Sequence, residues 1–582
     1  MLVIVLGFAF ILTGAFHGNV WFDESYSVAI ANHSFQDIWH IGSGDVHPVL
    51  FYWCLHVLDL LFGQNVLAYR LFSAAGTLAL ASLGLFVVRR DFGWRVGVFF
   101  SALSLFLPYM AFMAVEIRMY SWASFSVALC AFMAWRIACA MRAQGTDAAA
   151  GWWARIGCDP RLSRMRKWAG VPCRWWIVFY VASLMSAYLH YYGVLSAFFI
   201  NLFLLVFCVK QVLAHRAARR ADQTSESVSK KTLPRAKAPA RTPVKGLAVF
   251  AVGAVAQLAL YAPWLMVLAS QVGVVSSGTY WSDATFPRTF IEWAFYPVYT
   301  SQIIFADHSG WQYVIILYLC GIVAAAAAAV GAADLFRRLR RGWKSEGSGR
   351  RFSRLREWLF SHEAALPALL GLALYLCVLL FGVIASAVLD ILIVQTRYLS
   401  IALGPLILAA SVLLASIPKR SVVCGLAAAL LGASVVSQLM FIQDAYSEEN
   451  QDPLVWFEET VAENQGTGID GQIPVLSTDI GFEGVTAVTY PDIKQVYLNW
   501  QVGNWDLAYG AYAPTLSVVD SWNNILPDYS GAFVVLSQAR SSAETKEVEY
   551  LLAKDGIDMV DSRTFYRPYE RTWFTVSVME KQ

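Results

Sequence analysis

Residues 364–417 read AALPALLGLALYLCVLLFGVIASAVLDILIVQTRYLSIALGPLILAASVLLASI and contain two charged side chains, Asp390 and Arg397. A membrane-spanning helix needs about 20 consecutive apolar residues. This stretch therefore predicts two transmembrane helices, at 364–389 and 398–417, joined by a short polar turn. The whole chain has the same character, because 58% of its 582 residues are hydrophobic and 15% are charged, against about 25% charged residues in soluble domains. The composition excludes a soluble enzyme and a disordered protein.

Apolar segments of similar length recur along the first three quarters of the chain. Beyond the pair above, they lie at 1–18, 66–88, 96–114, 119–139, 175–192, 194–213, 246–268, 312–333 and 422–442. The sequence therefore predicts a polytopic α-helical membrane protein with about 11 transmembrane helices.

Basic side chains are distributed unevenly among the connections between these helices. Of the 44 Lys and Arg residues, 32 lie in alternate connections. Basic connections of membrane proteins face the cytoplasm, which predicts a multi-pass protein of the plasma membrane with a cytoplasmic amino terminus. Everything after Phe441 is then expected outside. Four isolated arginines remain on the outer side, namely Arg70, Arg118, Arg288 and Arg397.

Two further apolar segments, 47–63 and 290–305, are too short and too polar to be counted as spans. The first contains His56 and Asp59, and counting it as a span would move every later basic cluster to the other side of the membrane. We therefore expect both segments to form interfacial or re-entrant helices.

The segment 443–582 differs in character from the rest of the chain. It holds 22 acidic and 8 basic residues and no apolar run long enough to span a membrane. Short apolar runs at 473–479, 495–500 and 531–538 alternate with polar stretches, which predicts a small α/β domain outside the membrane. None of the nine Cys residues lies in it and no C-x-x-C pair occurs, so neither a disulfide framework nor a thiolate zinc site is expected.

Polar side chains gather at the predicted outer ends of the helices. The first outer loop reads NVWFDESYSVAIANHSFQDIWHIGSGDVHPVLFYW, and later outer junctions read AVEIRMYSW, YLHYYG and VQTRYLS. Ionisable residues near a bilayer are costly unless they are paired or used. Any one of them is equally compatible with a structural pair, a satisfied core histidine or a snorkelling anchor. Their convergence on one face favours a site.

The chemistry of these side chains suits group transfer from a phosphate. Carboxylates can act as general bases, and arginines can hold a phosphate through two parallel hydrogen bonds. The chain has no GxxxxGK(S/T) loop for a nucleotide phosphate. A membrane-embedded site without a nucleotide loop points to a phosphate that is linked to a lipid.

The ordered set WFDE, DVHPVLFYW, LPYMAFMAVEIRMYSW, YLHYYG, APWL (262–265) and TRYLSIALGP resembles the C-type membrane glycosyltransferase superfamily. The nearest group contains bacterial protein-mannosyltransferase-like and lipid A aminoarabinose-transferase-like enzymes. The resemblance implies a transmembrane glycosyltransferase domain at 1–442, with a catalytic outer loop at 19–63, followed by an extracytoplasmic α/β domain at 443–582. It further implies inverting transfer of a sugar from a polyprenyl phosphate carrier to an acceptor at the outer membrane face.

The resemblance also assigns roles by position. Asp23 would be the general base, assisted by Glu24. The carrier phosphate would be bound by Arg118, Arg397, Tyr120 and Tyr398, and the substrate cavity would be lined by Asp45, His47, Glu116, His190 and Tyr191. Val49 stands where the family has the second proline of D-x-H-P-P, so the shape of this loop departs from the family pattern.

Cofactors and partners follow from the same resemblance. Some members use a divalent cation, and the ligand spacing here neither assigns nor excludes Mg²⁺ or Mn²⁺. The expected partners are a polyprenyl-phosphate-linked sugar, membrane lipids and an acceptor that is a protein, a lipid or a glycan, and no nucleic acid. The alternative function is a lipid or sugar transporter, or flippase, without transferase activity, for which charged residues near mid-membrane and an internal repeat would be diagnostic.

Overall fold

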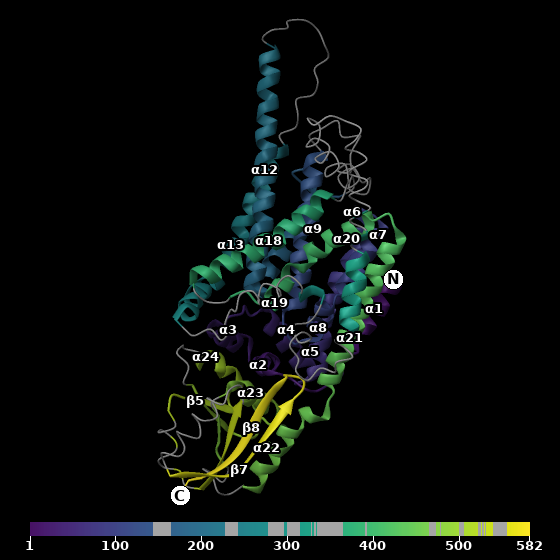
Figure 1. The fold of residues 1–582 in the computed structure, drawn as a ribbon. Coiled ribbons are helices and arrows are strands. Elements are labelled where there is room, and N and C mark those ends of the chain that lie inside the picture. Colours follow the sequence, from purple (N-terminus) through teal and green to yellow (C-terminus); the bar gives the residue numbers. More distant parts are fainter. Residues whose placement is uncertain are drawn as a thin grey trace.

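The structure is a computed structural model that describes most of the chain. The described residues are 1–143, 165–226, 242–277, 296–298, 315–327, 365–389, 393–464, 473–477, 479–499, 506–521, 531–538 and 556–581, with the single positions 329, 330, 333, 525 and 529. The described part is elongated, with a body of helices in its middle, a sheet domain at one end and a helix projecting from the other end (Figure 1).

Long apolar helices make up the helical body. Among the described residues, seven continuous helical segments are long and apolar enough to cross a membrane, and the bent pair α7–α8 makes an eighth. The seven are α5 with α6 (Val66–Phe92), α9 (Tyr120–Ala143), α12 (Tyr191–Glu226), α13 (Thr242–Ser277), α18 (Ala365–Leu389), α19 with α20 (Thr396–Ser416) and α21 (Arg420–Ala445). The chain is therefore a multi-pass membrane protein, and the prediction of a polytopic helical fold is confirmed.

The three remaining predicted spans are also helical. Two of their helices are shorter: α1 (Leu2–Leu12) has 11 residues and α11 (Cys173–Leu189) has 17, which reach about 17 to 26 Å at a rise of 1.5 Å per residue, less than the hydrocarbon core of about 30 Å. The third is described as a helix over Ile315–Ala327. The described residues thus place a helix at each of the eleven predicted positions, without each being a full span.

The predicted span 96–114 is broken in the structure. It consists of α7 (Trp94–Phe106) and α8 (Pro108–Val115), which meet at an angle of 59°. Pro108 causes the break, because proline disfavours the helical conformation of the residue before it and Leu107 is extended (φ −65°, ψ 126°). The bend directs the end of α8, and the linker that follows it, toward the short helices described next.

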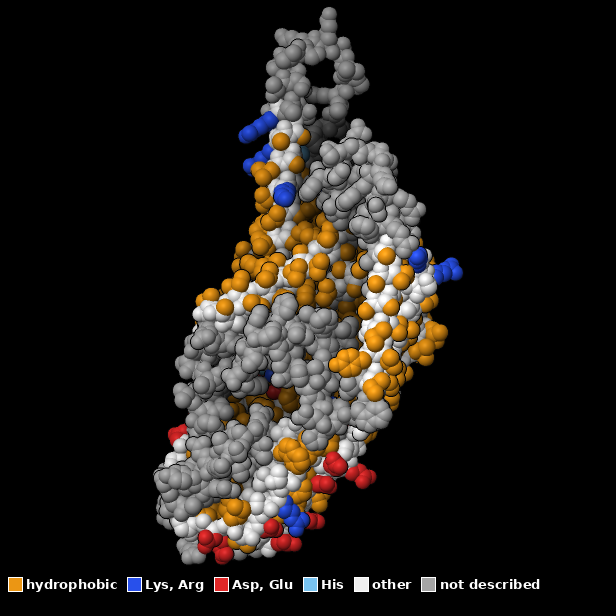
Figure 2. Space-filling view, viewed as in Figure 1, with side chains coloured by type: hydrophobic (Ala, Val, Ile, Leu, Met, Phe, Trp, Pro, Cys, Tyr) orange, Lys and Arg blue, Asp and Glu red, His pale blue; other side chains and the backbone are white. Residues whose placement is uncertain are grey.

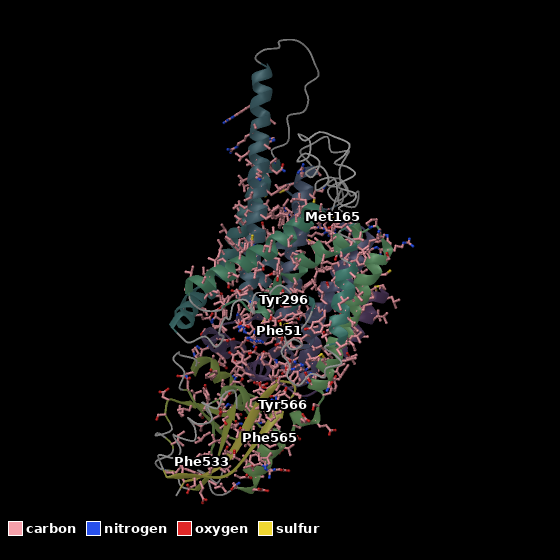
Figure 3. The ribbon with its side chains drawn as sticks, in the orientation of Figure 1. Phe51, Met165, Tyr296, Phe533, Phe565 and Tyr566 are labelled. Atoms are coloured by element: carbon pink, nitrogen blue, oxygen red, sulfur yellow. The ribbon has the colours of Figure 1, made fainter. Side chains whose placement is uncertain are left out.

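Short helices lie between the helical body and the sheet domain (Figure 1). They are α2 (Phe22–Ala31), α3 (Phe35–Gly44) and α4 (Leu50–Phe62). With 13 residues α4 spans about 20 Å, which agrees with the reading of 47–63 as a segment that does not cross. Of 290–305, the structure describes a 3-10 turn at Tyr296–Val298, and the rest of that prediction lies outside the described residues. Phe51 of α4 and Tyr296 are seen at this level of the molecule (Figure 3).

The sheet domain follows α21 and contains a mixed six-stranded sheet in the order β5-β4-β3-β6-β8-β7. Strands β3 (Val475–Ser477), β4 (Gln495–Leu498), β5 (Leu516–Val519) and β6 (Gly531–Gln538) pair in parallel. Strands β7 (Ile557–Arg567) and β8 (Thr572–Lys581) form an antiparallel hairpin beside β6. Helices α22 (Asp452–Glu463) and α23 (Ile480–Thr489) belong to the same domain. The predicted α/β domain is confirmed.

Charge is separated along the long axis of the molecule. Lys and Arg side chains are seen on the projecting end of α12 and around α6 (Arg89–Phe92), hydrophobic side chains cover the helical body, and Asp and Glu gather over the sheet domain (Figure 2). A hydrophobic middle between two polar ends is the surface expected of a protein that is embedded in a bilayer.

Candidate active site

The site is built around α2, whose first turn carries two adjacent acidic residues. Neighbouring residues of a helix point about 100° apart, so Asp23 and Glu24 cannot face the same partner. Asp23 forms an ion pair with Arg397 of α19 (Thr396–Leu399), whereas Glu24 forms one with Arg70 of α5 (Val66–Leu83). The paired carboxylates of the sequence therefore have separate surroundings.

Asp23 lies among cationic and hydroxyl groups. Beyond its ion pair with Arg397, its backbone carbonyl accepts a hydrogen bond from Arg118 at 3.1 Å, and the same guanidinium nitrogen donates to Ser27 Oγ at 3.3 Å and Tyr52 Oη at 3.4 Å. Burial raises the pKa of the Asp23 carboxyl, but Arg397, Arg118 and His47 lower it, and the net pKa is below its usual value. Asp23 is therefore ionised at neutral pH.

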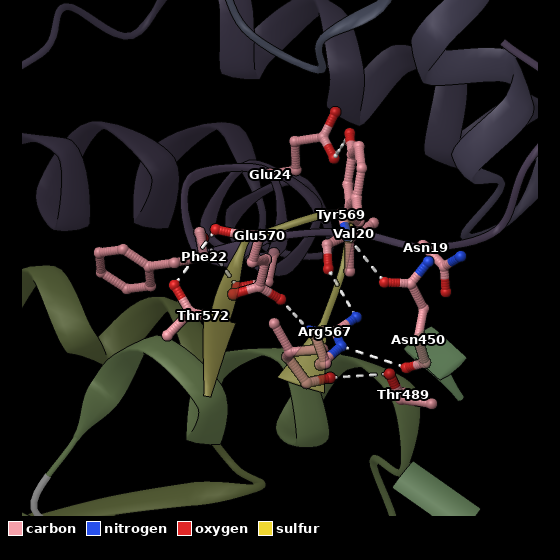
Figure 4. Close-up of polar contacts among 12 residues, drawn as sticks. Asn19, Val20, Phe22, Glu24, Asn450, Thr489, Arg567, Tyr569, Glu570 and Thr572 are labelled. Carbon is pink, nitrogen blue, oxygen red and sulfur yellow. Dashed lines mark hydrogen bonds and ion pairs between the residues drawn. The ribbon is translucent and has the colours of Figure 1, made fainter. Parts of the chain in front are cut away.

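Glu24 has no exposed surface, and its partners use both carboxylate oxygens. Arg70 donates to Oε1 at 2.7 Å and to Oε2 at 2.9 Å, and the backbone N–H of Ile117 donates to Oε1 at 3.0 Å. Tyr569, from the turn between β7 and β8, donates its hydroxyl to Oε2 at 2.9 Å. Figure 4 shows this contact between Tyr569 of the sheet domain and Glu24. We call Glu24, Arg70, Ile117 and Tyr569 the Glu24 node.

Asp45 and His47 lie on the other side of Arg118. The Tyr52 hydroxyl donates to Asp45 Oδ2 at 3.3 Å, and His47 Nδ1 is 3.4 Å from the same oxygen. Burial lowers the pKa of His47, although Asp45 raises it, and the net pKa is below its usual value. The imidazole is therefore neutral at pH 7, and the loop that follows α3 contributes one carboxylate and one neutral imidazole to the site.

An aromatic wall continues from His47. His190 caps the end of α11 in an extended conformation, and its ring is 5.3 Å from that of His47, 4.8 Å from Tyr398 and 5.7 Å from Tyr120. Gly193 permits the sharp turn into α12, since a Cβ there would come within 2.1 Å of the Ser186 carbonyl oxygen. Three helix ends thus supply one surface.

Tyr191 has a different environment from its neighbour His190. Its hydroxyl accepts a hydrogen bond from Trp264 Nε1 at 3.2 Å and donates to Gln271. Both partners belong to α13. The structure therefore groups Tyr191 with the APWL segment and not with the His190 and Tyr398 rings.

Glu116 lies in the linker between α8 and α9. Its side chain is 4% exposed, and neither carboxylate oxygen has a hydrogen-bond partner in the part of the chain that the structure describes. Burial, reinforced by Glu24 and Asp23, raises the pKa of Glu116 to about 8. The group is therefore a neutral carboxylic acid at pH 7, which can both donate and accept a hydrogen bond.

The described structure thus brings most of the predicted residues to the junction of the helical body and the sheet domain. The surface is hollowed there, and basic and acidic side chains are visible in the hollow (Figure 2). Sequence reasoning missed Ser27, Tyr52 and Tyr569. The first two lie in the quoted outer loop and could have been noticed, but nothing in the sequence associates Tyr569 with Glu24, 545 positions earlier. Arg288 and Asp390 lie outside the described residues.

An apolar cavity of about 300 Å³ lies deeper in the helical body. It is bounded by α9, α12, α18 and α20 (Leu403–Ser416). Lining side chains include Phe132, Trp135, Phe203, Leu374 and Leu408. Helices α9 and α12 carry Tyr120 and Tyr191 at their other ends, and α20 continues α19 with Arg397, so the polar site and the cavity share their walls.

Asp45 and His47 offer two ligands to a metal ion, fewer than the three or more protein ligands of most zinc sites. Among the described residues, no group of three His, Cys, Asp or Glu side chains is placed to hold a metal ion.

Comparison with known proteins gave structural matches at low sequence identity. No protein-family model and no curated protein sequence matches the chain. The chain is similar to the crystal structure of ArnT from Cupriavidus metallidurans bound to undecaprenyl phosphate, with 13% identity and a TM-score of 0.48 over 99% of this chain and 97% of that one. It is also similar to the oligosaccharyltransferase of Archaeoglobus fulgidus in complex with zinc and sulfate, with 10% identity and a TM-score of 0.40 over 92% of this chain and 68% of that one.

Proposed function

We propose that the protein is an inverting glycosyltransferase that moves a sugar from a polyprenyl-phosphate carrier to an acceptor at the outer face of the plasma membrane. One observation carries the proposal. The buried Arg118 and the partly buried Arg397, from different elements, meet the ionised Asp23 at the ends of helices whose other halves line an apolar cavity. This arrangement suits a substrate with an anionic head and a long apolar tail.

The donor phosphate would bind to Arg118 and Arg397. Guanidinium groups bind phosphate oxygens with charge-assisted hydrogen bonds, and the rings of Tyr120 and Tyr398 lie 6.4 Å apart beside these arginines. The polyprenyl chain would then run along α9 and α20. Phe132 lies twelve residues after Tyr120 in α9, about 18 Å along the helix axis, a distance that several isoprene units would cover.

Asp23 would act as the general base. The Asp23 carboxylate is paired with Arg397, which lowers the pKa of the group. A donor phosphate that binds Arg397 would compete for this guanidinium, and the basicity of Asp23 would rise when its cation is withdrawn. Donor binding would thus prepare the base.

At the anomeric carbon, the transfer forms one bond and breaks one bond. Asp23 takes the proton of the acceptor hydroxyl or amine, and the acceptor attacks the anomeric carbon from the face opposite the phosphate. The bond between the anomeric carbon and the phosphate oxygen breaks, its electrons stay with the departing polyprenyl phosphate, and the two arginines stabilise that charge. The configuration of the anomeric carbon is inverted.

Glu116 would hydrogen-bond a hydroxyl of the donor sugar. A neutral carboxylic acid whose oxygens have no hydrogen-bond partner among the described residues can donate to one hydroxyl oxygen and accept from another hydroxyl. His47, Asp45 and His190 would line the remainder of the sugar cavity, whereas Tyr191 would act from the α13 side. Glu24 would keep α2 in place through Arg70 and would not take part in proton transfer.

Transfer activity tests the proposal directly. Purified full-length protein is incubated with a panel of polyprenyl-phosphate sugars, and released polyprenyl phosphate and transferred or hydrolysed sugar are measured. We expect turnover with at least one donor, and none with the matching sugar nucleotides. Asp23→Asn should lower turnover by about 10²–10⁴-fold, whereas Asp492→Asn, at an exposed aspartate of the sheet domain, should leave it unchanged. Equal turnover by the wild type and Asp23→Asn would remove Asp23 from the base role.

A further inference from the structure

The contact between Tyr569 and Glu24 joins the sheet domain to the helix that carries Asp23. The two residues are 545 positions apart, and the contact is a hydrogen bond of 2.9 Å to a carboxylate oxygen that has no exposed surface. The Tyr569 hydroxyl also accepts a hydrogen bond from Arg70 at 3.3 Å. It therefore completes an ion pair that otherwise belongs to the helical body.

Tyr569 is held in place by the residues around it. Its backbone N–H donates to Asn450 Oδ1 at 2.9 Å, while Arg567 donates to the backbone carbonyls of Asn450 at 3.1 Å and of Val20 at 3.3 Å. Arg571, two residues further on, pairs with Asp444 at the end of α21, through Nε at 3.0 Å. The turn between β7 and β8 is thus attached to the helical body on both sides of Tyr569. Figure 4 shows the side with Arg567 and Val20.

The direction of the Tyr569 hydrogen bond follows from its surroundings. Burial raises the pKa of the phenol well above its usual value, Arg70 opposes this effect, and Glu24 adds to it. The hydroxyl therefore stays protonated and donates a hydrogen bond to the Glu24 carboxylate. The ring packs 4.8 Å from that of His17 and 6.1 Å from that of Phe441, so its orientation does not depend on the hydrogen bond alone.

The sheet domain holds α2 at a second point. The hydroxyls of Tyr512 and Ser25 are 3.0 Å apart, and Gly484 of α23 lies against both, since a Cβ there would meet Tyr512 Oη at 2.6 Å and Ser25 Oγ at 3.1 Å. The residue beside Asp23 and the one after it are therefore both held by the sheet domain. Asp23 itself faces Arg397 of the helical body.

The Glu24 node also contacts the linker that carries Arg118, one of the two arginines proposed to bind phosphate. Glu24 accepts from the N–H of Ile117, and Arg70 donates to the carbonyl of Val115 at 2.9 Å. These two residues flank Glu116, and Ile117 immediately precedes Arg118. A displacement of the Glu24 carboxylate would therefore shift Asp23 on one side and the Glu116–Arg118 linker on the other.

We infer that Tyr569 is a positioning residue of the active site. The sheet domain, through Tyr569, fixes the position of α2 relative to the 115–118 linker and so contributes to transferase activity. This inference gives the C-terminal domain a role and rests, in its kinetic part, on the proposed function. Tyr569 touches no substrate in this arrangement, because it acts through Glu24.

Hydrogen–deuterium exchange tests the structural part whatever reaction the protein catalyses. In full-length Tyr569→Phe protein in detergent, exchange should become about tenfold faster across 22–31 and 115–118, because one hydrogen bond to a charged group is lost. Tyr446→Phe is the matched control. Its hydroxyl bonds to the backbone of Thr13 and Phe16 beside the same His17 ring, without reaching Glu24. Unchanged exchange across 22–31 in Tyr569→Phe would overturn the inference.

A double-mutant cycle tests the kinetic part. Tyr569→Phe should lower kcat by about tenfold, since small displacements of reacting groups are costly, and leave the donor KM within about twofold. In a Glu24→Gln background the same change should have almost no further effect, because the hydroxyl acts through Glu24. Additive effects of the two changes would refute the positioning role. Absence of turnover in the wild type would instead refute the proposed function and leave the exchange result to decide the inference.

Discussion

The two acidic residues of α2 have opposite surroundings. Glu24 accepts hydrogen bonds from Arg70, Ile117 and Tyr569, which together use both of its carboxylate oxygens. The Asp23 carboxylate forms an ion pair with Arg397, and 14% of the Arg397 side chain is exposed. A carboxylate whose oxygens are fully engaged stabilises a fold, whereas one that shares a cation with an incoming anion can be released for chemistry. The adjacent residues teach that a paired-carboxylate motif need not be a pair in function.

Removing the cation of the Glu24 node should have the largest effect. Arg70→Ala leaves a buried carboxylate without its counter-ion, which costs about 3–5 kcal/mol in other proteins. We expect a lower thermal unfolding temperature in detergent and no measurable transfer. Arg216→Ala, at an exposed arginine on the α12 extension, is the control. Wild-type thermal stability of Arg70→Ala would erase the difference between the two carboxylates.

Removing the charge of Asp23 should affect turnover alone. Asp23→Asn keeps the shape of the side chain, and the loss of a general base typically lowers the rate by about 10²–10⁴-fold. We expect a fall of that size in kcat with an unfolding temperature close to that of the wild type. A large loss of stability would mean that Asp23, like Glu24, is a structural residue.

Arg397 should matter more for the donor than for the acceptor. A hydrogen bond to a charged group contributes about 1.5–3 kcal/mol, so Arg397→Ala should raise the donor KM by roughly 10- to 100-fold. The acceptor KM should change little. The measurement is steady-state kinetics with each substrate varied in turn, and an unchanged donor KM would reduce Arg397 to a membrane anchor.

Glu116 should produce the smallest effect, visible as a pH dependence. Its pKa of about 8 means that the neutral acid predominates below pH 8 and the carboxylate above it. If the neutral form binds the donor sugar, kcat/KM should fall as the pH rises through about 8. Glu116→Gln, which stays neutral, should lose a few-fold in activity at pH 7, as expected for one hydrogen bond of about 1 kcal/mol, and should not show this fall. The same alkaline limb in both proteins would assign it to another group.

The sequence predicted the helical fold and the gathering of polar side chains, because apolar length and basic connections are local signals. Asp23, Arg118, Arg397 and His190 follow from such signals, since each stands at the end of a helix on one predicted face. Which carboxylate meets which arginine depends on the phase of α2 and on the bend at Pro108, and both are set by packing. The predicted span at 96–114 ran through Pro108, so neither the break nor its 59° angle was predicted.

The sequence did not predict the long-range contacts between the sheet domain and α2. Tyr569 and Tyr512 are ordinary tyrosines in an acidic domain, and no spacing rule connects them with a loop near the amino terminus. The contacts of Tyr191 with Trp264 and Gln271 of α13 were not predicted either, because the turn at His190 separates two neighbouring residues that a continuous helix would have placed by a simple rotation.

The Glu24 node also has a consequence for biosynthesis. Glu24 and Arg70 are made early, and Tyr569 follows Glu24 by 545 residues, which takes roughly 30 to 110 s at about 5–20 residues per second. During that interval α2 lacks the hydrogen bond from the sheet domain, although its ion pair can already form. The candidate site is thus completed only after the sheet domain has been synthesised and has docked, so a chain that stalls within the membrane helices should lack the complete set of contacts around Glu24.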